Sequence, residues 1–194
     1  MSGLTRSAFI ARGAIATGSL YGAGAVGGYV TRALAQSGAG DIEIVNFALT
    51  LEYLEAAFYK EGLAKAGLSG QAKKLAKEIG DHENQHVAAL TSTVKQLGGK
   101  PAAVPMVAFP FKDQASFLKL AQVFEDTGVS AYNGAAPMIK SKEVLGAAGS
   151  IVQVEARHAA AIRLLNGANP SPAAFDPTLS KYQVLKAVKP FIKG

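Results

Sequence analysis

From Asp41 onward, hydrophobic residues recur every three or four positions, which is the period of an amphipathic helix. No segment shows a convincing strand pattern, so we predict an all-α fold. Capping side chains and glycine- or proline-rich breaks divide the pattern into five helices. The predicted starts are Asp41, Ser69, Asp113, Ser141 and Ser180, and the predicted ends lie near Gly67, Gly98, Pro137, Gly167 and Pro190.

The connections between these helices differ in length. Residues 99–112 contain three prolines and form a long connection, whereas the first and third connections are short. A stretch of about 14 residues can span the length of helices of about 25 residues. This order predicts a four-helix bundle with one long crossover between its second and third helices, followed by a short C-terminal helix.

Each of the four long helices carries a glutamate within its apolar stripe, at 100° per residue. These residues are Glu52, Glu83, Glu125 and Glu155, and the second and fourth helices add His86 and His158 on the same faces. Burying one unpaired carboxylate costs several kcal/mol, and no Lys or Arg on these stripes compensates. Two divalent cations would balance four carboxylates, with neutral imidazoles completing the ligand set.

The spacing of these residues supports a metal site. Glu83 and His86 are three residues apart, as are Glu155 and His158, so each pair shares one helix face. The chain also repeats: residues 51–59 align with 124–132, and residues 83–90 align with 155–162. Two halves related in this way would build a pseudo-two-fold site, with one metal nearer each half.

Two further residues, Glu55 and His82, lie near the predicted ligands in the sequence, and each has a structural interpretation as well as a functional one. Glu55 aligns with Gly128, so it has no symmetric partner. We therefore prefer Glu52 as the ligand. Glu55 could be an extra carboxylate that moves between redox states, but we expect it at the surface or an edge. His82 precedes His86 by four residues; it could adjoin the ligands or an entry, but we expect a solvated edge residue.

The chain resembles the ferritin-like di-iron carboxylate superfamily, which has this arrangement of Glu and Glu-x-x-His. Segments 51–59 and 154–160 look like the ferritin-like domain family that includes desiccation-related proteins, and the resemblance covers about residues 41–190. It implies that Glu83 and Glu155 bridge two metals. The resemblance assigns the remaining ligands as Glu52 with His86 at one metal and Glu125 with His158 at the other.

The resemblance also bears on neighbouring residues and on haem. Tyr59 and Tyr132 each follow an interior glutamate by seven residues and resemble tyrosines beside the ligands of bacterioferritins. They would donate a hydrogen bond to a ligand or supply an electron, or else serve as core aromatics. Asn84 stands where bacterioferritins carry their haem-ligating Met, so we expect no haem.

The composition narrows the chemistry further. The 194 residues contain no Cys, which excludes disulfides, thiolate zinc sites, iron–sulfur clusters and a catalytic thiol. We therefore expect no rubredoxin-like electron-transfer module and no complete rubrerythrin. Glu and His remain as the metal-binding residue types.

Residues 1–40 differ in composition from the predicted bundle, residues 41–194. They contain Arg6, Arg12 and Arg32 but no acidic residue, and residues 13–31 are uncharged. Ala33-Leu34-Ala35 forms a cleavage pattern, so we expect an export signal cleaved near Ala35 and a periplasmic or extracellular protein. Alternatives are a retained anchor that contacts the membrane or export machinery, or a Gly-rich assembly arm.

Removing those three arginines from the formal charge of +6 leaves about +3, which gives no case for nucleic-acid binding. We expect a di-metal protein, with two Fe or alternatively two Mn ions. It would oxidise Fe(II) or reduce dioxygen or peroxide in iron, oxidative or desiccation stress, or show manganese catalase-like activity. The alternative is an exported metal-binding stress or structural protein without turnover; a homo-oligomer is left open.

Overall fold

A computed structural model of the protein describes residues 39–193. Four long helices account for most of this part of the chain: α3 (Ala39–Lys65), α4 (Gly70–Gln96), α5 (Gln114–Ala135) and α6 (Lys142–Leu165). The shorter elements are α7 (Lys181–Val188), the 3-10 turns η1 (Ala136–Met138) and η2 (Lys189–Phe191), and the strands β1 (Met106–Val107) and β2 (Ile192–Lys193).

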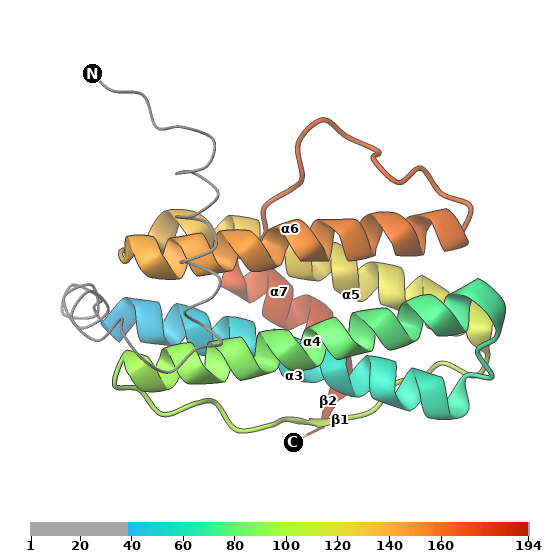
Figure 1. The fold of residues 1–194 in the computed structure, drawn as a ribbon, viewed down its shortest axis with the longest axis horizontal. Coiled ribbons are helices and arrows are strands. Elements are labelled where there is room, and N and C mark those ends of the chain that lie inside the picture. The colour runs from blue at the N-terminus through green and yellow to red at the C-terminus, as the bar shows by residue number, and fades with distance from the viewer. Residues whose placement is uncertain (1–38, 194) are drawn as a thin grey trace, which may run out of the picture.

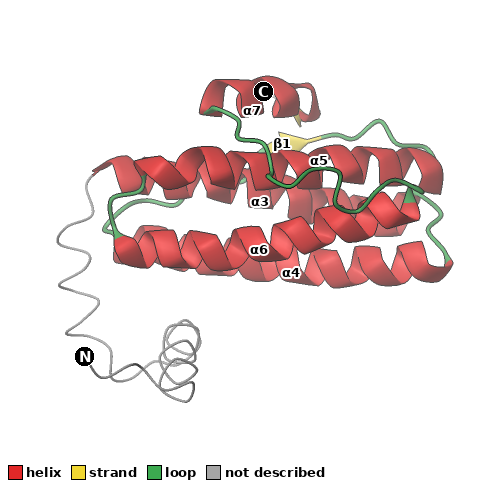
Figure 2. Ribbon diagram, turned by 90° about the horizontal axis from the view of Figure 1, so that it is seen from above, coloured by secondary structure: helices red, strands yellow, loops and turns green. Residues whose placement is uncertain are grey.

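The four long helices form one bundle (Figure 1). Helices α3 and α4 pack together as one hairpin, and α5 and α6 pack as a second. The connection between α4 and α5 runs along the length of the bundle, and α7 lies on the outside, against α5 (Figures 1 and 2). The predicted all-α bundle with one long crossover and a short last helix is confirmed.

Most of the predicted helix starts carry the expected caps. Asp113 accepts a hydrogen bond from the backbone N–H of Ser116, and Ser141 and Ser180 cap α6 and α7 in the same way. Ser69 precedes α4, but its hydroxyl makes no capping bond. The prediction for Asp41 was wrong: α3 begins at Ala39, and the Asp41 carboxylate accepts N–H bonds near the start of α6 instead.

The long crossover is held to the bundle at two places. The amide of Asn46 on α3 donates to the carbonyl of Lys100 and accepts from the backbone N–H of Ala102. Further along, β1 pairs antiparallel with β2, so that Val107 lies opposite Ile192. The sequence predicted no strands; this two-residue pairing arises because distant segments meet, and it is too short to produce an alternating pattern.

Two hydrophobic clusters fill the bundle interior. One contains aromatic side chains such as Phe58, Phe117 and Phe124, and the other contains aliphatic residues such as Val45 and Leu90. Along each long helix, a glutamate lies between residues of one hydrophobic cluster and residues of the other. The polar residues of the predicted site therefore lie in the middle of the bundle, with apolar packing on both sides.

The predicted N-terminal segment, residues 1–40, lies outside the described residues except for its last two. Among the residues that the structure describes, none of the helices is long and apolar enough to cross a membrane.

Candidate metal centre

The structure brings the six predicted ligands together at the centre of the bundle. The four glutamates have 0% exposure. His86 and His158 are also buried. The six residues are Glu52 on α3, Glu83 and His86 on α4, Glu125 on α5, and Glu155 and His158 on α6.

The ring of His86 faces three of these carboxylates. Its Nδ1 atom lies 2.9 Å from Oε1 of Glu155. It also lies 3.2 Å from Oε2 of Glu52 and 3.2 Å from Oε2 of Glu83. One imidazole nitrogen and three carboxylates from three helices therefore converge on one point.

His158 occupies the equivalent position in the second half of the repeat. Its Nδ1 atom lies 3.1 Å from Oε1 of Glu83, 3.4 Å from Oε2 of Glu125 and 3.6 Å from Oε2 of Glu155. Glu83 and Glu155 thus each turn one oxygen toward His86 and the other toward His158. This is the arrangement that a carboxylate needs to bridge two cations.

These contacts define two overlapping groups of ligand atoms, each within 4.8 Å of one another. The two groups share Glu83 and Glu155 and differ in their other members. They are Glu52, Glu83, His86 and Glu155, and Glu83, Glu125, Glu155 and His158.

Several buried atoms of the cluster lack a suitably oriented hydrogen-bond partner within the described part of the chain. They are Oε1 of Glu83, Oε2 of Glu125, both carboxylate oxygens of Glu155 and Nδ1 of His158. Buried polar atoms are normally satisfied, and lone pairs that converge without donors suit a cation. The donor set therefore fits a di-metal site.

Two tyrosines donate hydrogen bonds to Glu125 and Glu52, the two carboxylates that each face one histidine only. Tyr59 on α3 donates its hydroxyl proton to Oε1 of Glu125 on α5. Tyr132 on α5 donates to Oε1 of Glu52 on α3. In each glutamate the other oxygen, Oε2, faces the histidine of its own half. The hydrogen bonds cross between the two halves of the repeat and fix how the two carboxylates are turned.

Glu55 departs from its predicted surface or edge position. Its side chain is only 3% exposed and lies on α3 against α5, where a Cβ atom on Gly128 would come within 3.1 Å of Oε1 of Glu55. Gly128 is the repeat partner of Glu55, so the two equivalent positions face each other and only one of them has a side chain. Val188 of α7 and Phe124 line the same small space.

His82 is also not the solvated edge residue that we expected. Its Nδ1 atom lies 2.9 Å from Nε2 of His158, and the two rings are stacked. The spacing of His82 from His86 suggested a role near the ligands only as an alternative. The sequence could not decide between them because the contact is with α6, far away along the chain.

Burial and neighbouring charges shift the ionisation of the cluster in opposite directions. Burial raises the pKa of Glu125 to about 8, with Glu155 adding to the rise and His158 opposing it. Burial, followed by the charge of Glu155, also raises the pKa of Glu52 and of Glu55. Without metal, the centre therefore retains protons on buried carboxyl groups.

The histidines retain protons as well. Although burial lowers the pKa of an imidazole, the close carboxylate oxygens of Glu155, Glu52 and Glu83 raise the pKa of His86 to about 12. The close carboxylate oxygens of Glu125, Glu155 and Glu83 raise the pKa of His158 to about 12, again against burial. Burial alone would raise the pKa of Glu83, but the neighbouring rings of His158 and His86 lower it to about 2.

Comparison with known proteins identifies the family to which this centre belongs. The model of the ferritin-like domain family matches residues 40–168, which include the four long helices apart from Ala39 and the whole cluster. The chain belongs to the ferritin-like domain family. The predicted resemblance is therefore confirmed.

Two individual proteins are similar to this ferritin-like chain. A diiron-carboxylate ferritin-like protein from Bacillus anthracis has a similar fold, with a TM-score of 0.56 at 22% identity over 64% of this chain and 94% of that one. Protein rds1 of Schizosaccharomyces pombe is 24% identical over 162 residues, which are 79% of this chain. The chain spans 40% of the length of rds1.

Proposed function

We propose that the cluster binds two iron ions and that the protein uses them to oxidise Fe(II) or to reduce dioxygen or peroxide. The observation that carries this proposal is the division of the two bridging carboxylates. Glu83 and Glu155 each direct one oxygen to the side of His86 and one to the side of His158. Four carboxylates alone would also suit a single cation, but this division suits two.

The proposed ligand set follows from the same contacts. Glu52 and His86 would complete one metal position, and Glu125 and His158 would complete the other. Four ionised glutamates offset the charge of two divalent cations. Carboxylate and imidazole donors suit iron and manganese alike. We propose iron because the structural neighbour is titled a diiron-carboxylate protein.

Two Fe(II) ions held by these glutamates and histidines would supply two electrons in all, which together with two protons would reduce dioxygen to hydrogen peroxide or hydrogen peroxide to two water molecules. The protein supplies a buried pocket of preset ligands, which limits access of bulk water and other reductants.

The residues around the ligands support this role. Tyr59 and Tyr132 keep their hydroxyl protons, since burial and then the nearby glutamates raise the pKa of both phenols well above the ordinary value. Each hydroxyl therefore remains a donor to Oε1 of its glutamate, while Oε2 faces the histidine beside which metal would bind. These two bonds orient the outer ligands before metal arrives.

Substitution of the bridging ligand gives the decisive test. We expect Glu83→Gln to reduce the iron content from two ions to fewer than one per chain, because Glu83 belongs to both groups of ligand atoms. Fe(II) oxidation should then fall to the rate of free Fe(II) in buffer. Metal content would be measured by elemental analysis, and oxidation by near-ultraviolet absorbance after air is admitted to anaerobic protein.

The matched control is Glu78→Gln, because Glu78 is exposed on the same helix. This variant should bind and oxidise iron as the unsubstituted protein does. If the unsubstituted protein binds two iron ions but oxidises them no faster than buffer, the protein is a metal-binding stress or structural protein without turnover. If native protein contains manganese and decomposes peroxide, the choice of iron is wrong.

A further inference from the structure

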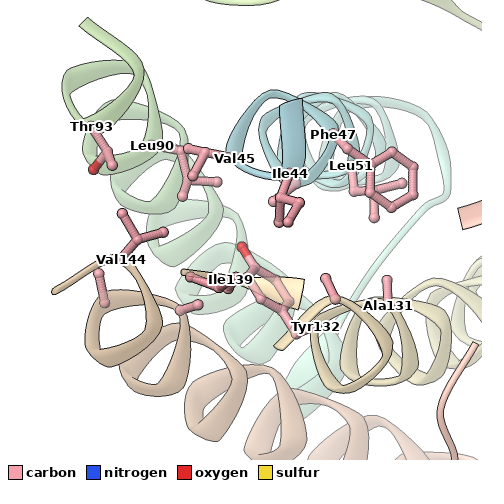
Figure 3. A pocket seen from close by; sticks show the side chains of 14 residues that line it. Ile44, Val45, Phe47, Leu51, Leu90, Thr93, Ala131, Tyr132, Ile139 and Val144 are labelled. Atoms are coloured by element: carbon pink, nitrogen blue, oxygen red, sulfur yellow. The ribbon is translucent and has the colours of Figure 1, made fainter. Parts of the chain in front are cut away.

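A small apolar cavity lies at the end of the bundle where α3 and α6 begin and α4 and α5 end (Figure 3). Its volume is about 30 Å³. Side chains from all four long helices line it, among them Ile44, Leu51, Leu90, Tyr132 and Val144. The cavity therefore lies between the four helices and opens partly toward the surface, since much of its lining is half-buried.

The described cavity lining provides few hydrogen-bond partners for a water molecule. Within the part of the chain that the structure describes, Thr93 and Tyr132 are the only lining residues with a polar side chain. Thr93 donates its hydroxyl proton to the carbonyl of Ala89, and Tyr132 donates to Glu52. A buried water normally makes about three hydrogen bonds. Since both hydroxyl protons are already engaged, the lining favours an apolar occupant over water or hydrogen peroxide.

The size of the cavity restricts that occupant. A space of about 10 to 15 Å³ by this measure holds one water-sized sphere. The cavity thus has room for a diatomic molecule, and it is much smaller than the roughly 150 Å³ cavity that binds benzene. An organic substrate would not fit without rearrangement of the helices.

Tyr132 connects the cavity to the candidate metal centre. Its ring forms part of the cavity wall (Figure 3), and its hydroxyl group donates to the carboxylate of Glu52. Half-buried residues such as Phe47, Ala147 and Ala148 also line the cavity, whereas Tyr132 is buried. The lining therefore extends from partly exposed positions to the side chain that contacts a proposed ligand.

We propose that this cavity binds dioxygen and passes it along Tyr132 to the metal centre. The proposal rests on the proposed function and deepens it, because it selects dioxygen over peroxide as the oxidant that uses this route. Dioxygen is small and apolar and suits this lining, whereas hydrogen peroxide needs hydrogen-bond donors as well as acceptors, and the described lining side chains have no free hydroxyl proton to donate.

The first test uses xenon as a probe of the metal-free protein, by crystallography under xenon pressure or by xenon NMR. Xenon is expected beside Tyr132 in the unsubstituted protein. Ala148→Leu, which fills the cavity, should abolish that binding. The matched control is Ala161→Leu, a half-buried position on the same helix that does not line the cavity. Circular dichroism would establish that both variants fold.

The second test follows iron oxidation with each oxidant separately. We expect Ala148→Leu to slow the reaction of Fe(II)-loaded protein with dioxygen by about tenfold while leaving the reaction with hydrogen peroxide within about twofold. Anaerobic Fe(II) binding should be unchanged. Ala161→Leu should react with both oxidants as the unsubstituted protein does. If Ala148→Leu does not fold, Ala135→Leu fills the same cavity from α5.

The outcomes separate this proposal from the one on which it rests. Absence of xenon from the cavity would overturn the dioxygen route, as would an equal loss of rate with both oxidants in Ala148→Leu. A third outcome is that xenon binds beside Tyr132 but the unsubstituted protein oxidises Fe(II) no faster than buffer does with either oxidant. The proposed function then fails, and the cavity binds apolar gas without a role in turnover.

Discussion

At the scale of single residues, the two oxygens of each glutamate in the centre have different neighbours. In Glu52 one oxygen accepts from Tyr132 and the other faces His86, whereas in Glu83 the two oxygens face the two histidines. The surroundings of each carboxylate therefore differ between the proposed outer ligand Glu52 and the proposed bridging ligand Glu83. Helix spacing places these glutamates on interior faces, but only the packed bundle shows which oxygen meets which neighbour.

His82 offers a prediction at this scale. If His158 binds metal through Nδ1, its Nε2 atom carries a proton and donates it to Nδ1 of His82. His82→Leu should weaken metal binding at the His158 position by about tenfold, because loss of such a partner leaves the ligand less well oriented. Anaerobic metal titration by calorimetry would measure the affinity.

Two variants distinguish orientation from general damage to α4. His82→Gln keeps an acceptor and should recover part of the affinity, and Gln85→Leu changes an exposed residue nearby and should leave it unaltered. The position nearer His86 should bind as before in all three variants. Equal weakening at both metal positions would show that His82 acts on the stability of the bundle and not on the orientation of His158.

At the scale of helices, a buried side chain in the first turn of α3 supports the start of α6. The Asp41 carboxylate has 0% exposure and accepts backbone N–H bonds from Lys140 and Ser141, each at 2.9 Å. Asp41→Ala should lower the free energy of unfolding by about 2 kcal/mol, since it leaves buried N–H groups without acceptors. Urea denaturation followed by circular dichroism would measure the loss.

The exposed cap of α5 provides a comparison. Asp113→Ala removes a local capping bond and should cost about 1 kcal/mol. The larger loss is expected at Asp41 because its contact joins two helices about 100 residues apart and is buried. A loss at Asp41 no greater than that at Asp113 would mean that the start of α6 is held mainly by Ser141.

The helix boundaries themselves were largely predictable. Asp113, Ser141 and Ser180 cap helices through contacts within three residues, so the local sequence contains the necessary information. Asp41 satisfies the same sequence rule, but its carboxylate is engaged by a distant segment. A capping residue predicted from local sequence fails in this way when tertiary structure offers its side chain buried donors.

At the scale of the whole molecule, the charges buried in the bundle make stability depend on pH. In the metal-free protein, the pKa of Glu125 is raised to about 8 from an ordinary value of 4.5. Between these values the folded state holds a proton that the unfolded chain has released, so unfolding becomes more favourable as pH rises. His86 and His158, with pKa values raised to about 12, act in the same direction above their ordinary value of 6.5.

We therefore expect the melting temperature of metal-free protein to fall between pH 5 and pH 8, measured by calorimetry at constant ionic strength. Metal-loaded protein should show no such fall, because metal binding requires deprotonated ligands and strengthens as pH rises. The pKa of Glu83 is lowered to about 2, so the ionised Glu83 stabilises the fold above pH 4.5. This contribution to stability is lost only as the pH falls from 4.5 towards 2. A parallel fall with and without metal would place the pH dependence outside the centre.

The helices, the long crossover and the inward direction of the four glutamates and two histidines could all be predicted, because they follow from local periodicity and spacing. The remaining features depend on how the helices pack. Glu55 is buried because Gly128 leaves room for it on α5, and His82 meets His158 because α4 packs beside α6. The apolar cavity beside Tyr132 likewise arises only where four helix ends meet. Contacts of this kind depend on how helix faces fit together, which no spacing along one helix can specify.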